Sequence, residues 1–521
     1  MENRVEYIKD RVMPGVVCES VGEYLLPDYN GDVKKILHVG VRVMPSGKFI
    51  SGDTAEFTGT VGYEVVYIDG DSCISHFAFS TDYEFAVKCS DEKFVNSDID
   101  VTLDNYNLRP IGPRKISAKA QLSGTVHLIE REEVVIDGDG FTDGEPEVLT
   151  KDALVRAAYF DKGRETEICE ELVHLDGVIA DEVEILYTGY EVRVDERDAG
   201  RDGARHKGEI KVACLLKCGD SVPEMMEKAF VIEDSFFTSD ELPKEALNDA
   251  RVISSSICVK SVASSVSATA DGASVTVSLV TEGKMRISAN TAVMLAKDAF
   301  LTECGTENEV SEFAYSELLG GATRISSVTG ESDASSSGYE GGSFIFVSPK
   351  ARVNSVEIID NTVKLSGDIR FSAIACEVSE GDIPVFSSVK ADVPFEEKVN
   401  VGCQIPKGAK AEFEISVREG EIELVGDKLR MSAKLDLSVC ASKDRRESYV
   451  SASYKTDTVF EKDPSLVTVY YPDPGETLFE VSKKFHRSPL SVASVNSLTE
   501  SVFADKTAPL NSLGVKKLTI R

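Results

Sequence analysis

Hydrophobic and polar residues alternate with period two along most of the chain up to about residue 460. Clear examples are VEILYTGYEVRV at 183–194, SVTVSLV at 274–280 and KLRMSAKLDLSV at 428–439. Alternation rich in Val, Ile, Thr and aromatic residues is typical of half-buried strands, and strands at intervals of about ten residues indicate sandwiches or barrels. The pattern therefore predicts a mainly β chain.

Two short motifs recur three times within this pattern. GTVGYEVVY, GEIKVACLL and GDIRFSAIA begin at Gly59, Gly208 and Gly367, where a glycine suits a β-bulge or a close backbone approach. KISAKAQL, RISANTAV and RMSAKLDL follow downstream, with serines at 117, 288 and 432. We expect three tandem copies of one sandwich-like or barrel-like β topology, with these glycines and serines at equivalent positions. An Ile-Leu pair precedes the first two glycines at the same interval. The third copy lacks this pair, so we expect it to be shorter at its front.

Shifts in composition suggest where the copies end. DGDGFTDGEPE at 137–147 is acidic and glycine-rich, and DASSSGYEGGS at 333–343 has the composition of a Ser/Gly linker. The charged stretch at 195–209 is interpreted as a loop within the second copy. The expected domains are 1–150, 151–335 and 343–460 for the three β copies, and 464–521 for a different, smaller unit.

The pattern changes in this C-terminal unit. LVTVYY at 466–471 is predicted to be a strand, and PDPGE at 472–476 a tight turn. Thr477 followed by Glu480 is a capping-box signal, in which each side chain satisfies a free backbone N–H at a helix start. The order predicted for the unit is β-α-α-β.

Two short helices are expected between the strands of this unit. Leu478, Val481 and Phe485 form one apolar stripe on the first helix. Ser488-Pro489 opens a second helix that ends near Asn496, and KKLTI at 516–520 returns as a strand.

Charge and cysteine content narrow the partners and the compartment. The net charge is −32, from 89 acidic and 57 basic residues, which disfavours nucleic acid and anionic membranes. The chain shows no apolar run of about 18 residues, and its first residues show no secretory signal. Eleven scattered cysteines are typical of reduced thiols in a cytosol. We expect a cytoplasmic protein that does not insert into membranes.

Candidate chemistry is sparse. The nucleotide-binding, zinc-protease and serine-hydrolase motifs are absent, and the six histidines are dispersed. Cys214 and Cys218 would stand roughly 13 Å apart on a strand, too far for one disulfide or one zinc ion. The acidic stretch that begins at Asp137 lacks the residue order of an EF-hand loop. The sequence therefore predicts no catalytic residue, no metal and no cofactor.

The C-terminal unit resembles the LysM domain. The resemblance rests on YYPDPGETLFEVSKKFHRSPLSVASVN and the terminal KKLTI. LysM domains bind N-acetylglucosamine glycans, and some bind proteins. Here Glu476 stands where the family has Asp, the 499–515 segment lacks the usual Pro-Gly-Gln turn, and the chain has no Trp to stack on a sugar. The resemblance implies a binding site in the turn and groove, at Asp473, Pro474, Gly475, Glu476, Thr477, Lys483, Lys484 and Asn496.

The β copies resemble SPOCS domains, through EYLLPDYNGDVKKILHV from Glu23 and LRPIGPRKISAKAQL at 108–122. Tandem SPOCS domains followed by one LysM domain are typical of SipL-like spore morphogenetic proteins of anaerobic Firmicutes. The resemblance implies a non-enzymatic scaffold in the mother-cell cytoplasm, at the forespore surface, whose LysM domain contacts the coat-assembly ATPase or another coat protein. The alternatives are a peptidoglycan-binding protein of the cell envelope and an enzyme.

Overall fold

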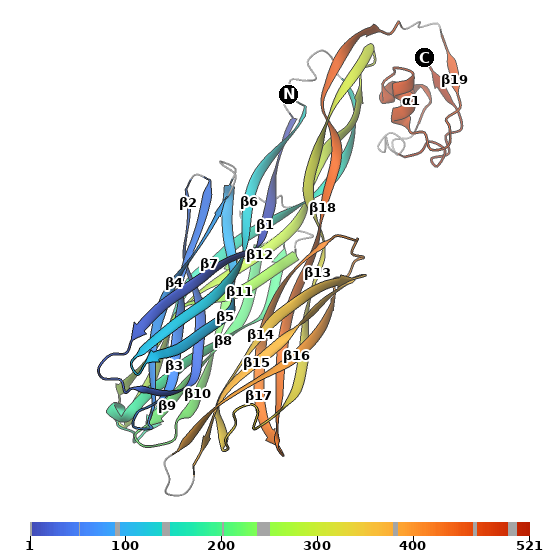
Figure 1. The fold of residues 1–521 in the computed structure, drawn as a ribbon. Coiled ribbons are helices and arrows are strands. Elements are labelled where there is room, and N and C mark those ends of the chain that lie inside the picture. Colours follow the sequence, from blue (N-terminus) through green and yellow to red (C-terminus); the bar gives the residue numbers. More distant parts are fainter. Residues whose placement is uncertain are drawn as a thin grey trace.

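The computed structural model describes antiparallel β-sheets with two short helices near the C-terminal end (Figure 1). The described residues are 3–51, 53–88, 94–137, 146–200, 203–236, 251–378, 384–461, 466–498 and 508–521. The prediction of a mainly β chain is confirmed. Most of the acidic stretch between the first two copies, at 138–145, lies outside the described residues.

Strands β1 to β18 fall into three sets of six that share one strand order. In each set, the second, third and fourth strands form a meander, and the first, sixth and fifth strands form another sheet in that order. The first set is β1 (Asn3–Leu25), β2 (Val33–Ser51), β3 (Thr54–Asp69), β4 (Ile74–Lys88), β5 (Phe94–Gly112) and β6 (Lys115–Asp137). The second is β7 (Glu147–Asp176), β8 (Val183–Gly200), β9 (Gly203–Cys218), β10 (Glu224–Phe236), β11 (Arg251–Ala268) and β12 (Gly272–Phe300), with a 3₁₀ turn at Ala180–Glu182. The third is β13 (Cys304–Asp333), β14 (Ser343–Ile359), β15 (Thr362–Glu377), β16 (Val385–Asn400), β17 (Lys410–Val425) and β18 (Lys428–Val459).

The two sheets of each set contribute residues to a common hydrophobic core. In β16, the buried Val389, Val393 and Phe395 alternate with exposed lysine and acidic residues, as the period-two pattern predicts. In the first set, Val61 and Tyr63 of β3 share a cluster with Ala120 and Leu122 of β6. Burial of each large apolar side chain stabilises such a core by about 1.5–3 kcal/mol.

The three motif glycines occupy equivalent places, as expected. Gly59, Gly208 and Gly367 lie on the central strand of each meander, opposite a register shift in the preceding strand. A Cβ atom at each would lie 2.5 Å or less from the carbonyl oxygen of Met44, Arg193 or Arg352, respectively. A bulge brings the neighbouring backbone too close for any side chain, so each position requires glycine.

The three motif serines lie on the sixth strand of their sets, but only two of them lie near the same end of that strand. Ser117 and Ser432 lie close to the start of β6 and β18, whereas Ser288 lies in the second half of β12. The expected equivalence of Ser288 is therefore wrong, because β12 carries its own alternating run, GASVTVSLV, next to the hairpin.

The strand pairing places the boundary between the second and third copies earlier in the chain than the sequence predicted. Residues 304–333 form β13, which pairs along its length with β18 of the third set. The third set is thus not shorter at its front, and the Ser/Gly stretch at 333–343 connects β13 to β14 within it. The charged stretch at 195–209 is also not a loop: it forms the end of β8 and the start of β9 around their hairpin.

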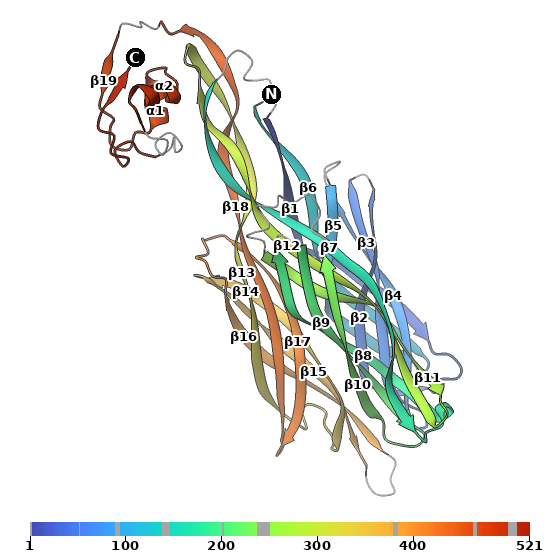
Figure 2. The ribbon, with the colours of Figure 1, turned by 180° about the vertical axis from the view of Figure 1, so that it is seen from behind.

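Four long strands continue beyond the sheets as an arm (Figure 2). The arm consists of the paired ribbons β7–β12 and β13–β18, at residues 147–156, 289–300, 304–318 and 443–459. Val155, Leu295, Phe313 and Val450 belong to its core, so each ribbon supplies apolar residues to the contact. Lys151 of β7 also forms a 2.7 Å ion pair with Glu447 of β18. The arm carries the C-terminal unit at its far end (Figures 1 and 2).

Candidate functional site

The C-terminal unit begins with a short strand and a tight turn. Strand β19 (Thr468–Tyr470) pairs antiparallel with β20 (Leu518–Ile520). The N–H of Glu476 donates to the carbonyl oxygen of Asp473 over 3.0 Å, which closes the turn. Gly475 has φ +97°, as the third residue of a type II turn requires, and Pro474 precedes it. The predicted turn is confirmed.

Glu476 stabilises this turn from within. Its carboxylate accepts hydrogen bonds from the Tyr470 hydroxyl (2.8 and 2.9 Å) and from the backbone N–H of Asp473 (2.8 Å), and it lies 3.6 Å from the Lys484 ammonium. Partial burial alone would raise its pKa, but these donors outweigh burial and hold the pKa below its ordinary value. The ammonium of Lys484 lies over the Tyr470 ring, 4.6 Å from its centroid. Glu476 and Lys484 are therefore part of the unit's own framework.

The capping box at the start of α1 (Leu478–Lys484) forms as predicted. The backbone N–H of Glu480 donates to the Thr477 hydroxyl over 3.2 Å, and the Glu480 carboxylate accepts from the Thr477 N–H over 2.9 Å. This reciprocal pair satisfies two backbone donors that a helix start leaves without partners.

Helix α2 (Pro489–Val495) begins at the Ser488 cap, also as predicted, and Asn496 ends it. The Asn496 side chain fastens the helix to β20. It donates to the carbonyl oxygens of Val492 and Thr519 (2.8 Å each) and accepts from the Thr519 N–H (2.6 Å). Asn496 thus holds the helix and the last strand together.

The apolar stripe of α1 forms the core of the unit. Leu478 and Val481 are buried there, with Phe485 packed against them. The substitution Val481→Ala should cost about 1–3 kcal/mol of local stability, because Val481 is fully buried. Hydrogen exchange of the α1 and α2 amides in the full chain measures this loss. Leu490→Ala, at a side chain that is 63% exposed, is the matched control and should leave exchange nearly unchanged.

A second face of α1 contacts the end of the arm. The Lys483 ammonium lies 2.7 Å from both carboxylate oxygens of Asp298 on β12. Phe479 is buried edge-on against Phe300, with ring centroids 5.2 Å apart. Just beyond the helix, the ring of His486 stacks on Phe460. This face is engaged within the chain.

The sequence-predicted site residues therefore divide into two groups. Asp473, Pro474 and Gly475 are exposed at the tip of the turn. The other five have partners inside the chain: Glu476, Thr477, Lys483, Lys484 and Asn496. Residues 499–507, in the connection from α2 to β20, lie outside the described residues.

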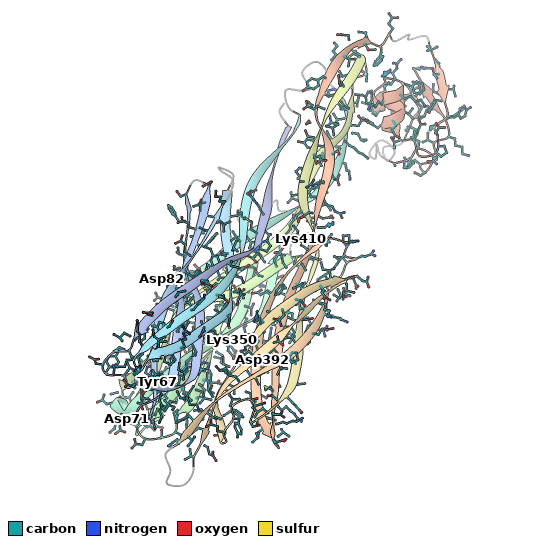
Figure 3. All side chains as sticks on the ribbon, viewed as in Figure 1. Tyr67, Asp71, Asp82, Lys350, Asp392 and Lys410 are labelled. Carbon is teal, nitrogen blue, oxygen red and sulfur yellow. The ribbon has the colours of Figure 1, made fainter. Side chains whose placement is uncertain are left out.

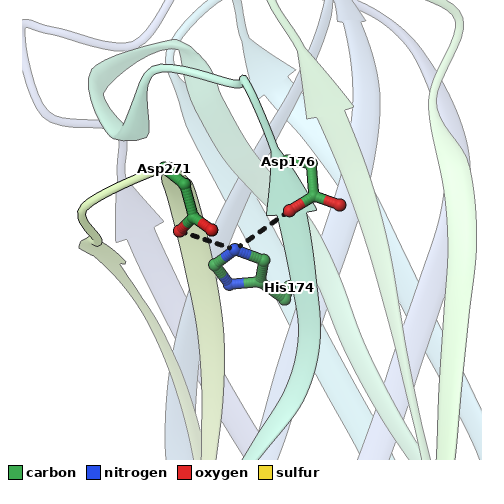
Figure 4. A group of neighbouring side chains, drawn as sticks. All are labelled: His174, Asp176 and Asp271. Atoms are coloured by element: carbon green, nitrogen blue, oxygen red, sulfur yellow. Dashed lines mark ion pairs between the residues drawn. The ribbon is translucent and has the colours of Figure 1, made fainter.

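A histidine–carboxylate group lies at one corner of the second set (Figure 4). The Nε2 atom of His174 lies 3.3 Å from Oδ1 of Asp176 and 3.2 Å from Oδ1 of Asp271. These are the ligand types that bind divalent metal ions. This group is not apparent in the sequence, because Asp271 lies in the β11–β12 hairpin, far along the chain from β7. The one local feature that could have indicated this group is the His-x-Asp spacing of His174 and Asp176.

A network of buried charges joins the three sets. Glu412 of β17 lies 2.5 Å from the guanidinium of Arg156 on β7 and 3.3 Å from that of Arg286 on β12. Arg286 also lies 3.4 Å from Asp100 of β5, which lies 3.5 Å from His127 of β6. Burial would raise the pKa of Glu412, but Arg156 and Arg286 lower it to about 2. The network therefore has the character of a structural junction between sets.

Two further groups near the set contacts have perturbed pKa values. Lys350 of β14 donates to the carbonyl oxygen of Val41, between the third and first sets, and burial lowers its pKa to about 8 (Figure 3). Glu414 lines a cavity of about 150 Å³ with Arg197 and Asp436, and burial raises its pKa to about 7. Perturbed pKa values mark functional and structural sites alike.

Comparisons with known proteins identified no similar protein. Neither the protein-family models nor the curated proteins nor the solved structures gave a match. In the part of the chain that the structure describes, no helix is long and apolar enough to cross a membrane. The cysteines in that part are free thiols.

Proposed function

We propose that this chain is a non-enzymatic scaffold and adaptor of spore coat morphogenesis. Three tandem β-sandwich repeats of the SPOCS type form the scaffold, and the C-terminal unit is a LysM-type docking module. The module contacts a coat-assembly ATPase, or another coat protein, at the forespore surface in the mother-cell cytoplasm. The observation that carries the proposal is the architecture: one strand order repeated three times, followed by a single βααβ unit at the end of an arm.

The arm supports a docking role because it separates the module from the body of the scaffold. Its two ribbons share a buried core and the Lys151–Glu447 ion pair, so it is built as a packed element. The contacts of Lys483 and Phe479 fix one face of the module on its end. The tip of the turn remains exposed for a partner.

The exposed surface of the module suits a protein partner with a basic and apolar face. Val469 of β19 is 55% exposed, and Tyr471, which follows this strand into the turn, is 67% exposed. Asp473 adds an exposed negative charge beside them. Aromatic side chains at a protein interface bury large areas, and complementary charge accelerates the encounter.

The substitution Asp473→Lys tests this surface. It should leave the module folded, because its side chain is exposed and the turn is closed by backbone groups and Glu476. It should weaken binding to the purified ATPase by at least about fivefold, and more at low salt, since charge complementarity is screened. Titration calorimetry measures the affinity, and Glu461→Lys, an equal charge change outside the turn, is the control.

A sedimentation assay on purified peptidoglycan separates this proposal from the alternative of a glycan-binding envelope protein. We expect the chain to remain in the supernatant. Retention on peptidoglycan that Asp473→Lys abolishes, together with no binding to coat proteins, would favour the envelope protein instead.

A further inference from the structure

We propose that the corner of the second set formed by His174, Asp176 and Asp271 is a binding site for one divalent transition-metal ion such as Zn²⁺. This site lies on the β repeats, and its assignment is independent of the adaptor function. His174 and Asp176 end β7, and Asp271 lies in the β11–β12 hairpin (Figure 4).

The spacing of the ligand atoms fits tetrahedral coordination. Zn²⁺ binds imidazole nitrogen and carboxylate oxygen at about 2.0–2.2 Å. Two ligands at about 2.0 Å on a tetrahedral ion are separated by about 3.3 Å. The Nε2 atom of His174 lies 3.3 and 3.2 Å from the two aspartate oxygens, and the three residues offer ligand atoms that all lie within 4.8 Å of one another, so the aspartate side chains would need to close around an ion. The three protein ligands leave the fourth position for water or another ligand, as in sites that keep an open position.

The backbone holds these ligands in place before any ion binds. Asp176 pairs with Gly272 in the β7–β12 ladder, and the N–H of Gly177 donates to the carbonyl oxygen of Asp271 over 2.8 Å. An ion here would tie the end of β7 to the hairpin that follows β11. Because Asp176 is 88% exposed and Asp271 is 73% exposed, the ion would exchange with solution and the fold would not depend on it.

The other ring nitrogen of His174 faces a further carboxylate. Its Nδ1 atom lies 3.9 Å from Oε2 of Glu171, and the Ser274 hydroxyl donates to that same carboxylate oxygen. Metal-bound histidines commonly direct their other nitrogen toward a carboxylate, which fixes the ring and raises its basicity.

The same corner contains a positive side chain in the other two sets. In the first set, the Arg114 guanidinium of the β5–β6 hairpin lies 3.5 Å from Asp28 and 3.6 Å from Asp32. In the third set, Lys428 and Arg430 of β18 lie within 3.7 Å of Glu331.

In the second set, the segments that form this corner carry acids and no lysine or arginine, although the Lys228 ammonium of β10 donates to the backbone carbonyl oxygen of Glu171 over 2.8 Å. Both of its segments, 171–182 and 266–275, lie in the described part of the chain, and neither contains either residue type. Their sequence does contain five carboxylates, including Asp181 and Glu182. A bound cation would supply the positive charge that a side chain supplies in the other sets. The imidazole selects a transition metal over Ca²⁺ or Mg²⁺, which prefer oxygen ligands.

Metal titration of the full chain, prepared without a polyhistidine tag, tests the site. We expect one Zn²⁺ per chain by calorimetry, and visible absorption bands of four-coordinate Co²⁺ that Zn²⁺ displaces. His174→Ala and Asp271→Asn should each weaken binding at least tenfold. Glu171→Gln, which alters only the outer carboxylate 3.9 Å from Nδ1, should weaken it less than either of these two variants.

His76→Ala is the matched control, because His76 is a partly exposed imidazole 3.6 Å from a single carboxylate, Glu184. This variant should bind Zn²⁺ as the unaltered chain does. Circular dichroism checks that every variant keeps its β structure. The site assignment fails if the chain binds no Zn²⁺, if His174→Ala and Asp271→Asn bind it unchanged, or if Ca²⁺ competes equally.

Discussion

Deletion of residues 466–521 is expected to abolish recruitment of the protein to the forespore surface. If the proposed adaptor function holds, a fluorescent fusion of the full-length chain should encircle the forespore, and a fusion of the truncated chain should spread through the mother cell. The physical reason is that the deletion removes the exposed turn at Asp473 to Gly475 and the whole module that displays it. Fluorescence microscopy of sporulating cells measures the distribution.

The deletion should leave the β repeats folded. The core clusters of the three sets and of the arm contain no residue from 466–521. Truncation does uncover Phe300 at the end of β12, so the truncated chain should be checked for monodispersity and for its melting curve. Normal encirclement by a folded, truncated chain would mean that the repeats, and not the module, carry the docking surface.

Local signals in the sequence predicted the parts of the structure that depend on local geometry. The Pro474–Gly475 turn, the Thr477 capping box and the Ser488 cap each involve groups within a few residues of one another. The equivalent positions of the motif glycines could also be predicted from the sequence, because a bulge that leaves no room for a side chain requires glycine. These features need no knowledge of distant partners.

The same local signals could not predict which strands pair over long distances along the chain. Strand β13 alternates as any strand does, and nothing in its residues shows that it pairs with β18, which begins 95 residues after β13 ends. A Ser/Gly stretch at 333–343 resembles an interdomain linker in composition, although it connects two strands of one set. Composition reports solvent exposure and backbone freedom, and both occur within domains as well as between them.

For the candidate binding residues too, local sequence could not show which side chains have partners elsewhere in the chain. Asn496 and Glu476 match positions of a binding motif, yet their side chains are used in hydrogen bonds to β20 and to the turn. Lys483 was expected in the binding site, but its ammonium group pairs with Asp298 of the arm. Whether a polar side chain is free for a ligand depends on partners far away in sequence.

Loss of the Glu412 carboxylate is expected to destabilise the junction of the three sets more than any surface change. Glu412→Ala would remove the carboxylate that the buried guanidinium groups of Arg156 and Arg286 share, while Arg286 would keep its contact with Asp100 at 3.4 Å. Breaking a buried ion pair by removing one partner costs about 3–5 kcal/mol, because the remaining charge stays out of water. Urea unfolding at neutral pH measures the change in the free energy of unfolding. Glu419→Ala is the matched control on the same strand: its partner Lys434 is exposed, and little change should follow.

The pH dependence of this effect identifies its cause. The pKa of Glu412 is lowered in the folded chain from 4.5 to about 2, so its contribution to stability is fully present above pH 4.5 and is lost as the pH falls toward 2. The difference between the unaltered chain and Glu412→Ala should therefore narrow over that interval, while the effect of Val481→Ala, an uncharged change, should not follow this titration. A difference that stays constant with pH would show that Glu412 acts through packing and not through its charge.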